Sequence, residues 1–302
     1  MQLGLKIDVD TYRGTLQGVP RLMRLLDTHN VRATFLFSLG PDHTGRALKR
    51  IFRPGFLNKV SRTSVIGHYG IRTLLNGVLL PGPDIGKHCA SILRSVRDAG
   101  HEVGIHTWDH IRWQDGIETA NEQWTEVEMY KAVNRFAEVF GSPAQTHGAA
   151  GWQMNEHALN LTAKLGFDYS SDTRGHSPFI PFVNGEVIPC PQLPGNLPTL
   201  DELIGVSDVN ENNVVDHVLQ LTEIKSDHAP IYTLHAELEG MKLLPIFSHL
   251  LQGWQRQGYT LGTSREIFQQ LDLQRLPVHH AVRGIVPGRS GTLMIQGDLV
   301  TL

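Results

Sequence analysis

Short strand-like runs alternate with longer helix-like runs along most of the chain, and this alternation limits the possible folds more than any other feature. The strand-like runs are rich in β-branched and aromatic residues, whereas the helix-like runs repeat apolar residues every three or four positions. Such an alternation is typical of an α/β protein with a parallel sheet, either open or closed into a barrel. Strands are expected at 3–10, 33–39, 101–107, 143–150, 167–173, 230–238 and 259–263.

Polar residues with catalytic potential lie where four of the expected strands end. They are Asp8 and Asp10, His106, Asp172 and His235. In α/β barrels the active site lies at the C-terminal ends of the strands, so this placement favours a barrel over an open sheet. No internal repeat or long linker divides the chain, and we expect a single domain over residues 1–302.

The composition of the chain argues against several classes of protein. The formal net charge of −3 gives no signal for polyanion binding, so no nucleic-acid partner is expected. Cys89 and Cys190 are the two cysteines, which predicts neither a disulfide framework nor a cysteine metal site and favours a reducing compartment. The sequence shows no signal peptide and no run of 18 apolar residues, and we expect a cytoplasmic protein.

Residues 41–90 form an insert that departs from the alternation. They contain eight lysines and arginines against two aspartates, with phenylalanine and leucine interleaved. Basic amphipathic segments of this kind bind anionic membrane surfaces, but a solvated insert with ordinary surface charges is the alternative. A second departure is a short C-terminal extension, expected from about residue 276.

The two aspartates and a histidine pair predict a metal site. His106 and His110 are spaced i, i+4, which on a helical turn would place both imidazoles on one face, although two unrelated surface histidines are the alternative. One carboxylate and two imidazoles supply three ligands and leave a position open for water. We therefore expect Asp10 to bind the metal with both histidines. Asp8 would then act as the general base on the attacking water.

These residues resemble the motifs of the polysaccharide deacetylase family, also called the NodB-homology group or carbohydrate esterase family 4. The similarity rests on the aspartate pair, on "HTWDH" at 106–110 and on "YTLHAE" around His235, and it extends over roughly residues 3–265. It implies an irregular (β/α)7 barrel, and it implies that His235 is the general acid. It also implies one divalent metal ion, for which zinc, cobalt, manganese and iron all suit the ligands.

Further stretches resemble one branch of this family, among them "LKIDVDTYRGTLQGVPRL", "YSSDTRG", "LHAELEG" and "VRGIVPGR". That branch removes the formyl group from 4-deoxy-4-formamido-L-arabinose linked to undecaprenyl phosphate, a step of lipid A modification. The resemblance implies a peripheral enzyme on the inner face of the bacterial inner membrane, where the anionic surface is a partner. An N-deacetylase acting on another acetylated amino sugar and a non-catalytic barrel that binds a lipid-linked sugar are the alternatives.

One position departs from the family pattern. The family carries an arginine in its third motif, where it pairs with the catalytic base, and the corresponding residue here is Gly148. Arg174 is expected either to supply this charge or to bind the substrate phosphate, and a surface arginine is the alternative. The resemblance also suggests that Asp172 orients His235 or lines the pocket.

Two further residues are candidates for binding the substrate. Glu237 follows His235 on the same strand face, as Glu239 does, although both glutamates could be residues of the barrel rim. Trp108 lies between the two ligand histidines and is expected to wall the pocket, with a packed aromatic as the alternative.

Overall fold

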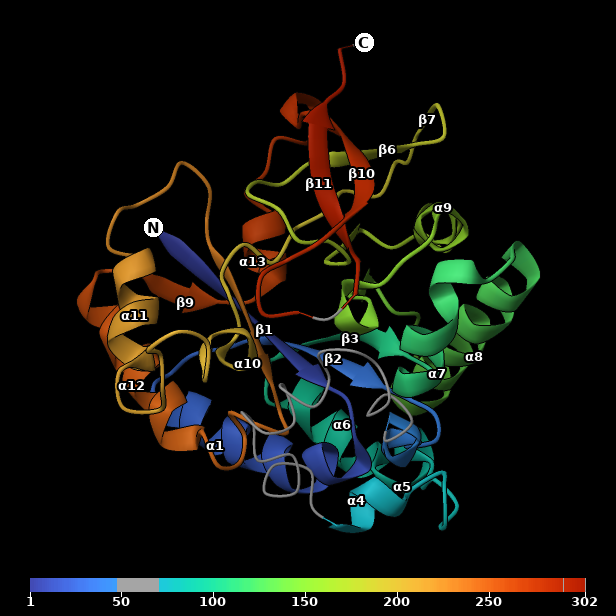
Figure 1. The fold of residues 1–302 in the computed structure, drawn as a ribbon, viewed down its shortest axis with the longest axis horizontal. Helices are drawn as coiled ribbons and strands as arrows, with labels where there is room; N and C mark the ends of the chain where they lie inside the picture. The colour runs from blue at the N-terminus through green and yellow to red at the C-terminus, as the bar shows by residue number, and fades with distance from the viewer. Residues whose placement is uncertain (48–70, 290, 302) are drawn as a thin grey trace.

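The computed structural model describes residues 1–47, 71–289 and 291–301. Within these residues the main sheet has seven parallel strands in the order β5-β4-β3-β2-β1-β8, and β9 pairs with the start of β1 (Figure 1). The α/β class and the parallel sheet are therefore confirmed. The strands are β1 (Gln2–Val9), β2 (Thr34–Ser38), β3 (Glu102–Thr107), β4 (Thr146–His147), β5 (Tyr169–Ser170), β8 (Ile231–His235) and β9 (Thr260–Gly262).

Strand β1 is an interior strand, paired along both of its edges, and the twist between neighbouring strands curls the sheet around it. Lys6 lies opposite Thr34 of β2 on one side and Thr233 of β8 on the other. The segment 192–196 lies between the two ends of the curl. Its first residue pairs with β5, and its last accepts a hydrogen bond from the first backbone N–H of β8.

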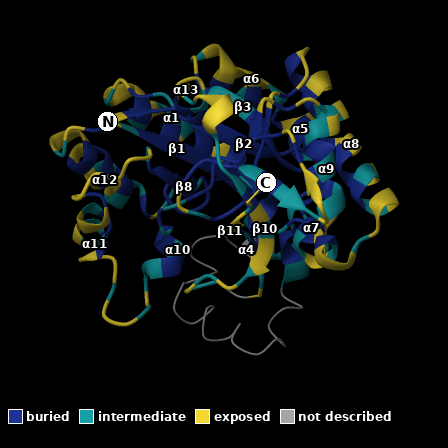
Figure 2. Ribbon diagram, turned by 90° about the horizontal axis from the view of Figure 1, so that it is seen from above, coloured by how far each residue is buried: buried dark blue, intermediate teal, exposed yellow. Residues whose placement is uncertain are grey.

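Helices surround the curled sheet and turn their apolar faces toward it. In α1 the buried residues Val19, Leu22 and Leu26 recur at helical spacing. Figure 2 shows the buried strands at the centre and the exposed faces of the helices at the periphery. The helices of this layer are α1 (Val19–Thr28), α6 (Ala90–Asp98), α8 (Glu122–Phe140), α9 (Glu156–Lys164), α11 (Val214–Leu221), α12 (Leu244–Arg256) and α13 (Ser264–Phe268).

Strand β1 is buried on both faces, as expected for a central parallel strand. Leu5 and Ile7 belong to the hydrophobic core under the helices. Because side chains alternate along a strand, Lys6 and Asp8 share the other face, inside the curl. Two charged side chains thus lie on the inner face of a strand whose outer face is apolar.

Shorter helices connect the strands and line the end of the sheet where the strands finish. Among them, α7 follows β3 directly and α10 precedes β8 in the chain (Figure 1). None of the described helices has the length and the apolar character needed to span a bilayer. The short helices are η1 (Gly14–Gly18), α4 (Ile71–Leu75), α5 (Ile85–His88), α7 (His110–Gly116), η3 (Ile117–Thr119), η4 (Ala150–Trp152), α10 (Leu200–Leu203) and η5 (Leu273–Arg275).

A second, smaller sheet was not expected from the sequence. Within the described residues it has four strands in the order β11-β10-β6-β7, and β10 and β11 form a hairpin from the expected C-terminal extension (Figure 1). The hairpin is tied to the main body at Arg174, which exchanges backbone hydrogen bonds with Met294 and Gln296. The strands are β6 (Ile180–Val183), β7 (Glu186–Val187), β10 (Val278–Gly284) and β11 (Leu293–Leu299). A single domain remains a prediction.

Candidate active site

Asp10, His106 and His110 meet at the ends of β1 and β3. Asp10 Oδ1 lies 3.2 Å from His106 Nε2, and Asp10 Oδ2 lies 3.5 Å from His110 Nε2. One ligand atom from each of the three residues lies within 4.8 Å of the others, which fits a shared cation. The structure therefore brings together the three residues that the sequence predicted as metal ligands.

The expectation that both histidines lie on one helical turn was wrong. His106 belongs to strand β3, which ends at Thr107, whereas His110 is the first residue of α7. The change from strand to helix is fixed by Asp109, whose side chain accepts a hydrogen bond from the backbone N–H of Arg112 and caps the helix. The two imidazoles stack with ring centroids 5.3 Å apart because this turn folds them together.

Hydrogen bonding orients the His106 ring toward Asp10. Its Nδ1 lies 2.6 Å from the carbonyl oxygen of Gly148. Because a carbonyl only accepts, Nδ1 carries the proton and the Nε2 lone pair is directed at the ligand cluster. Burial lowers the pKa of His106, but the carboxylates of Asp8 and Asp10 outweigh this effect, so the pKa is raised.

Two carboxylate oxygens of the site suit a divalent cation. Asp8 Oδ1 and Asp10 Oδ1 are buried, and neither has a hydrogen-bond partner within the described part of the chain. Burial raises the pKa of Asp10, but His110 and His106 outweigh it and hold that pKa below its usual range. Buried, ionised carboxylate oxygens without donors are costly unless a cation fills the site. The donor set of two imidazoles and one carboxylate fits the expected metal ion without identifying it.

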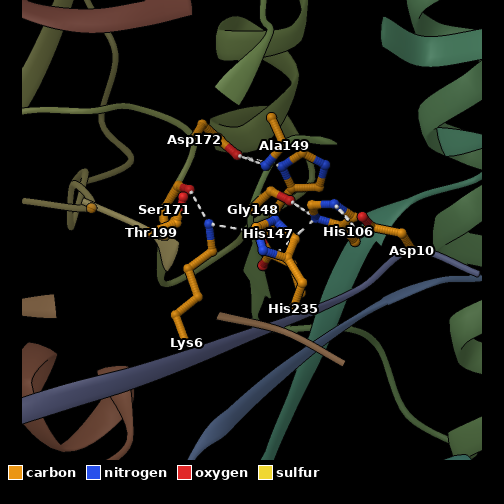
Figure 3. Close-up of polar contacts among 12 residues, drawn as sticks. Lys6, Asp10, His106, His147, Gly148, Ala149, Ser171, Asp172, Thr199 and His235 are labelled. Carbon is orange, nitrogen blue, oxygen red and sulfur yellow. Dashed lines mark hydrogen bonds and ion pairs between the residues drawn. The ribbon is translucent and has the colours of Figure 1, made fainter. Parts of the chain in front are cut away.

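Asp8 is paired with a residue that the sequence analysis missed. Lys6 Nζ lies 3.4 Å from Asp8 Oδ2, and the lysine side chain is fully buried. The same ammonium donates a hydrogen bond to the carbonyl oxygen of Ser171 at 3.3 Å (Figure 3). It also lies 4.9 Å from the centroid of the Trp152 ring. The signal was available, since Lys6 shares a strand face with Asp8 in an otherwise apolar run.

His235 ends β8 beside the end of β1, with Asp8 opposite it in the register. Its Nδ1 lies 3.9 Å from Asp201 Oδ1. Asp201 belongs to α10 and was not among the candidates, because no local pattern links it to a histidine 34 positions away. An acid at this position is suited to orienting the imidazole.

Asp172 does not orient His235 as suggested. Its Oδ1 instead accepts hydrogen bonds from His147 Nδ1 at 2.6 Å and from the backbone N–H of Ala149 at 2.8 Å (Figure 3). These bonds fix the loop after β4, which also supplies the Gly148 carbonyl to His106. Asp172 therefore supports the site through the backbone around Gly148.

Comparison with known proteins agrees with this geometry. A family model described as polysaccharide deacetylase matches residues 9–170, just over half of the chain. The chain belongs to the polysaccharide deacetylase family. A probable 4-deoxy-4-formamido-L-arabinose-phosphoundecaprenol deformylase (ArnD) of Shewanella sediminis is 35% identical over 299 residues, which are 99% of this chain and 96% of that protein. A protein of the same description from Wigglesworthia glossinidia brevipalpis is 30% identical over 289 residues, or 95% and 99% of the two chains.

The fold of this polysaccharide deacetylase is shared with a solved relative. The crystal structure of a putative polysaccharide deacetylase from Mycobacterium smegmatis superposes with a TM-score of 0.60 at 16% identity, covering 94% of this chain and 96% of that one. At this identity the likeness concerns the fold alone. The irregular barrel expected from the resemblance is confirmed, and so is the class of enzyme, a hydrolase that removes acyl groups.

The departure at Gly148 now has a structural explanation. A Cβ atom on Gly148 would lie 2.3 Å from Leu36 Cδ1 and 3.1 Å from Lys6 Cε, so no side chain fits there without movement of Leu36. The end of the Lys6 side chain lies directly beside this position. The expectation that Arg174 pairs with Asp8 was wrong, since Lys6 holds that position.

Arg174 is a structural anchor in this deacetylase. Its three guanidinium nitrogens donate to the carbonyl of Gly195 at 2.9 Å, to Glu202 at 2.7 Å and to the carbonyl of Leu197 at 3.1 Å. These bonds fix the loop that precedes α10 and the helix itself, which carries Asp201. Binding of the substrate phosphate by Arg174 remains a prediction, and this engagement with protein acceptors weighs against it.

Glu237 binds the backbone that follows β1 and does not lie on a strand face with His235. Strand β8 ends at His235, so the expected placement was wrong. Glu237 Oε1 accepts hydrogen bonds from the backbone N–H groups of Asp10 and Thr11 at 3.1 and 2.8 Å and from the Thr11 hydroxyl at 2.8 Å. Burial and the charge of Asp10 raise the pKa of Glu237 well above its ordinary value. Its role in substrate binding stays a prediction.

Glu239 contacts the backbone of His235. Its Oε2 accepts a hydrogen bond from the backbone N–H of His235 at 2.9 Å, and burial raises its pKa to about 7.

Trp108 is half-buried, with the Arg135 guanidinium 5.1 Å from its ring centroid. Its ring packs against Gly40, where a Cβ atom would come within 2.5 Å of it. Whether Trp108 also walls the pocket remains a prediction.

Proposed function

We propose that this protein hydrolyses the formamide of 4-deoxy-4-formamido-L-arabinose-phosphoundecaprenol. The products are formate and the lipid-linked amino sugar that serves lipid A modification. The observation that carries the proposal is the 35% identity, over nearly the whole of both chains, to a relative described as this deformylase. The meeting of Asp10, His106 and His110 beside Asp8 supports it, because this set provides what amide hydrolysis requires.

The side chains divide the reaction between them. A divalent cation held by Asp10, His106 and His110 would polarise the formyl carbonyl and lower the pKa of water. Asp8 takes the proton from the attacking water as the new C–O bond forms at the formyl carbon. His235 gives its proton to the amine nitrogen as the C–N bond breaks, which makes the amine a viable leaving group.

The surroundings of His235 suit the role of general acid. Asp201, with its Oδ1 3.9 Å from Nδ1, places a carboxylate beside the imidazole. The Glu239 carboxylate contacts the backbone of the same residue. Asp8 and His235 end neighbouring strands in register, so a substrate between them meets a base and an acid at once.

We infer that the protein acts at the inner face of the inner membrane as a peripheral protein, because the proposed substrate has a polyprenyl tail in the bilayer. Part of the basic insert at 41–90 lies outside the described residues. In its described part, Val78, Leu79 and Leu80 are 52%, 76% and 40% exposed at one turn. Three adjacent exposed apolar side chains are suited to contact with lipid.

The experiment that tests the function measures formate and acetate together. Protein reconstituted with a divalent cation receives the lipid-linked formamido-arabinose in one assay and an N-acetylated sugar oligomer in the other. We expect formate from the first substrate, no acetate from the second, and loss of formate release on chelation.

The other outcomes separate the alternatives. Acetate without formate would retain the site assignments and replace the proposed substrate by an acetylated amino sugar. Neither product, with the cation measured as bound, would support a non-catalytic barrel that binds lipid-linked sugar.

A further inference from the structure

Asp8 is buried, and its two carboxylate oxygens have different surroundings. The residue is 2% exposed. Its Oδ2 contacts Lys6 Nζ at 3.4 Å, whereas Oδ1 has no hydrogen-bond donor within the described residues and lies 3.9 Å from His106 Nδ1. One oxygen is therefore held by a cation, and the other is left without a donor, beside the ring nitrogen of His106 that faces Gly148.

The ammonium group of Lys6 is itself fixed from several directions. It donates to the carbonyl of Ser171 and lies over the face of the Trp152 ring, and both partners are buried. Its stem passes Gly148, where a Cβ atom would lie 3.1 Å from Cε. A lysine normally keeps its charged end in water. The ammonium of Lys6 is instead buried, and its three contacts fix its position.

Two carboxylates near Lys6 offset part of the cost of burying it. Burial lowers the pKa of Lys6 and Arg174 adds to this shift, while the carboxylates of Asp8 and Asp172 oppose it without reversing it. Asp172 thus contributes to the site a second time, because it offsets part of the cost of burying the ammonium.

We propose that Lys6 is the positioning residue for the general base: its ammonium holds Asp8 Oδ2 so that Oδ1 faces the attacking water, and it does so from strand β1 itself, two residues before the base. The inference rests on the proposed amide hydrolysis, in which Asp8 takes the proton. Gly148 leaves the space that the lysine stem needs.

The test combines Lys6→Met, Lys6→Arg, Asp8→Asn and the double variant Lys6→Met/Asp8→Asn. Methionine has a similar length without the charge, and arginine keeps the charge. For each protein we would measure bound cation per chain, kcat and KM for acyl release, and the urea concentration at the midpoint of unfolding.

We expect Lys6→Met to keep its cation and a KM within about threefold, while kcat falls about 100-fold, a typical effect of disabling a general base. Lys6→Arg should keep a kcat at least about tenfold above that of Lys6→Met, given the size of that effect. In the Asp8→Asn background, removing Lys6 should cost no further rate. The double variant should also unfold at a higher urea concentration than Lys6→Met, because the neutral amide introduced by Asp8→Asn needs no buried cation.

A matched control is Arg265→Met. Arg265 pairs with the buried Glu102 at the start of β3, which is the end opposite His106, with Nε 3.1 Å from Oε1. This variant also leaves a buried carboxylate without its cation, so stability should fall while kcat stays unchanged.

Three results would overturn the proposal. They are a kcat of Lys6→Met within about threefold of the wild type, loss of the cation from that variant, and independent, additive effects of the two substitutions on rate and unfolding. If Lys6→Met does not fold, the double variant decides: its failure to fold as well would show that Lys6 stabilises the barrel independently of Asp8. The unfolding and cation measurements need no substrate. They therefore distinguish failure of the proposed role of Lys6 from failure of the proposed function.

Discussion

At the scale of single residues, the two aspartates of β1 differ through their partners. Asp10 lies against two imidazoles, and Asp8 lies against an ammonium. Both are carboxylates at the end of the same strand, yet one is placed to bind a cation and the other to accept a proton. Environment, more than residue type, assigns the two roles.

This division of roles predicts different effects of neighbouring substitutions. Asp10→Asn and His106→Ala should lose the cation and all activity, whereas Asp8→Asn should keep the cation and lose turnover by at least about 100-fold. Metal content and formate release on the same preparations would test this. Metal loss from Asp8→Asn alone would mean that the two aspartates have exchanged roles.

A second prediction concerns His101, at the opposite end of β3. Its Nδ1 accepts a hydrogen bond from the backbone N–H of Ala33 at 3.2 Å, which requires a neutral ring. Burial and then the charge of Arg32 lower the pKa of His101 to about 4. Because the unfolded chain binds a proton near pH 6.5 and the folded one does not, stability should fall as the pH drops from 6.5 toward 4.

The size of this effect is about 3 kcal/mol at the lower end of that range, as an order of magnitude. Urea unfolding at pH 7.5 and pH 5 would measure it in the wild type and in His101→Gln, whose side-chain oxygen can accept the same hydrogen bond. We expect a smaller pH dependence in the variant. Equal dependence in both proteins would assign the loss to other groups.

At the scale of secondary structure, the site depends on the change from strand β3 to helix α7. Asp109 caps α7, and its Oδ2 also lies 2.6 Å from Nδ1 of His43. One side chain therefore fixes the first turn of the helix that carries His110. The position of a proposed metal ligand is thus set by a helix cap.

Asp109→Ala should remove this cap and cost about 1 kcal/mol of stability. It should also weaken cation binding, because His110 is then less firmly held. Asp109→Asn keeps a capping oxygen and should retain most of the affinity. Isothermal titration calorimetry of the cation with the wild type and both variants would test this. Equal affinity in all three proteins would show that the cap does not position His110.

At the scale of the whole molecule, the C-terminal hairpin reaches the barrel through Arg289. Its Nε donates to Glu202 at 2.7 Å, and its Nη2 lies 3.7 Å from Asp201 Oδ1. The guanidinium groups of Arg174 and Arg289 both lie near the Trp152 ring, at 4.8 and 4.7 Å from its centroid. The acid that faces His235 is therefore held in part by a segment more than 80 residues later in the chain.

Arg289→Met should lower stability by about 1–3 kcal/mol, since Glu202 loses one of its two buried cations. It should also reduce kcat through Asp201. Arg283→Met removes an exposed arginine of the same hairpin and should affect neither quantity. Urea unfolding and acyl-release kinetics would compare the two, and an unchanged kcat in Arg289→Met would show that the hairpin does not act on Asp201.

The proposed membrane contact predicts salt-sensitive binding to vesicles with anionic lipid. Leu79→Asp should weaken this binding about tenfold, as expected when one leucine no longer leaves water. Ile224, which is 88% exposed after α11, offers a matched control as Ile224→Asp. Sedimentation with vesicles at two salt concentrations would measure both, and equal loss in the two variants would contradict a specific contact at Leu79.

The sequence by itself determined the parallel α/β fold and the three residues that form the ligand cluster. Both depend on local patterns, because strand periodicity places side chains and parallel strands bring their ends together. Only the tertiary structure decided that Lys6, and not Arg174, pairs with Asp8, that Asp201, and not Asp172, faces His235, and that His106 and His110 meet across a strand-to-helix turn. Each of these contacts depends on distances between side chains that the packing of the whole barrel sets. Spacing along the chain places Lys6 on the strand face of Asp8, but it does not fix these distances.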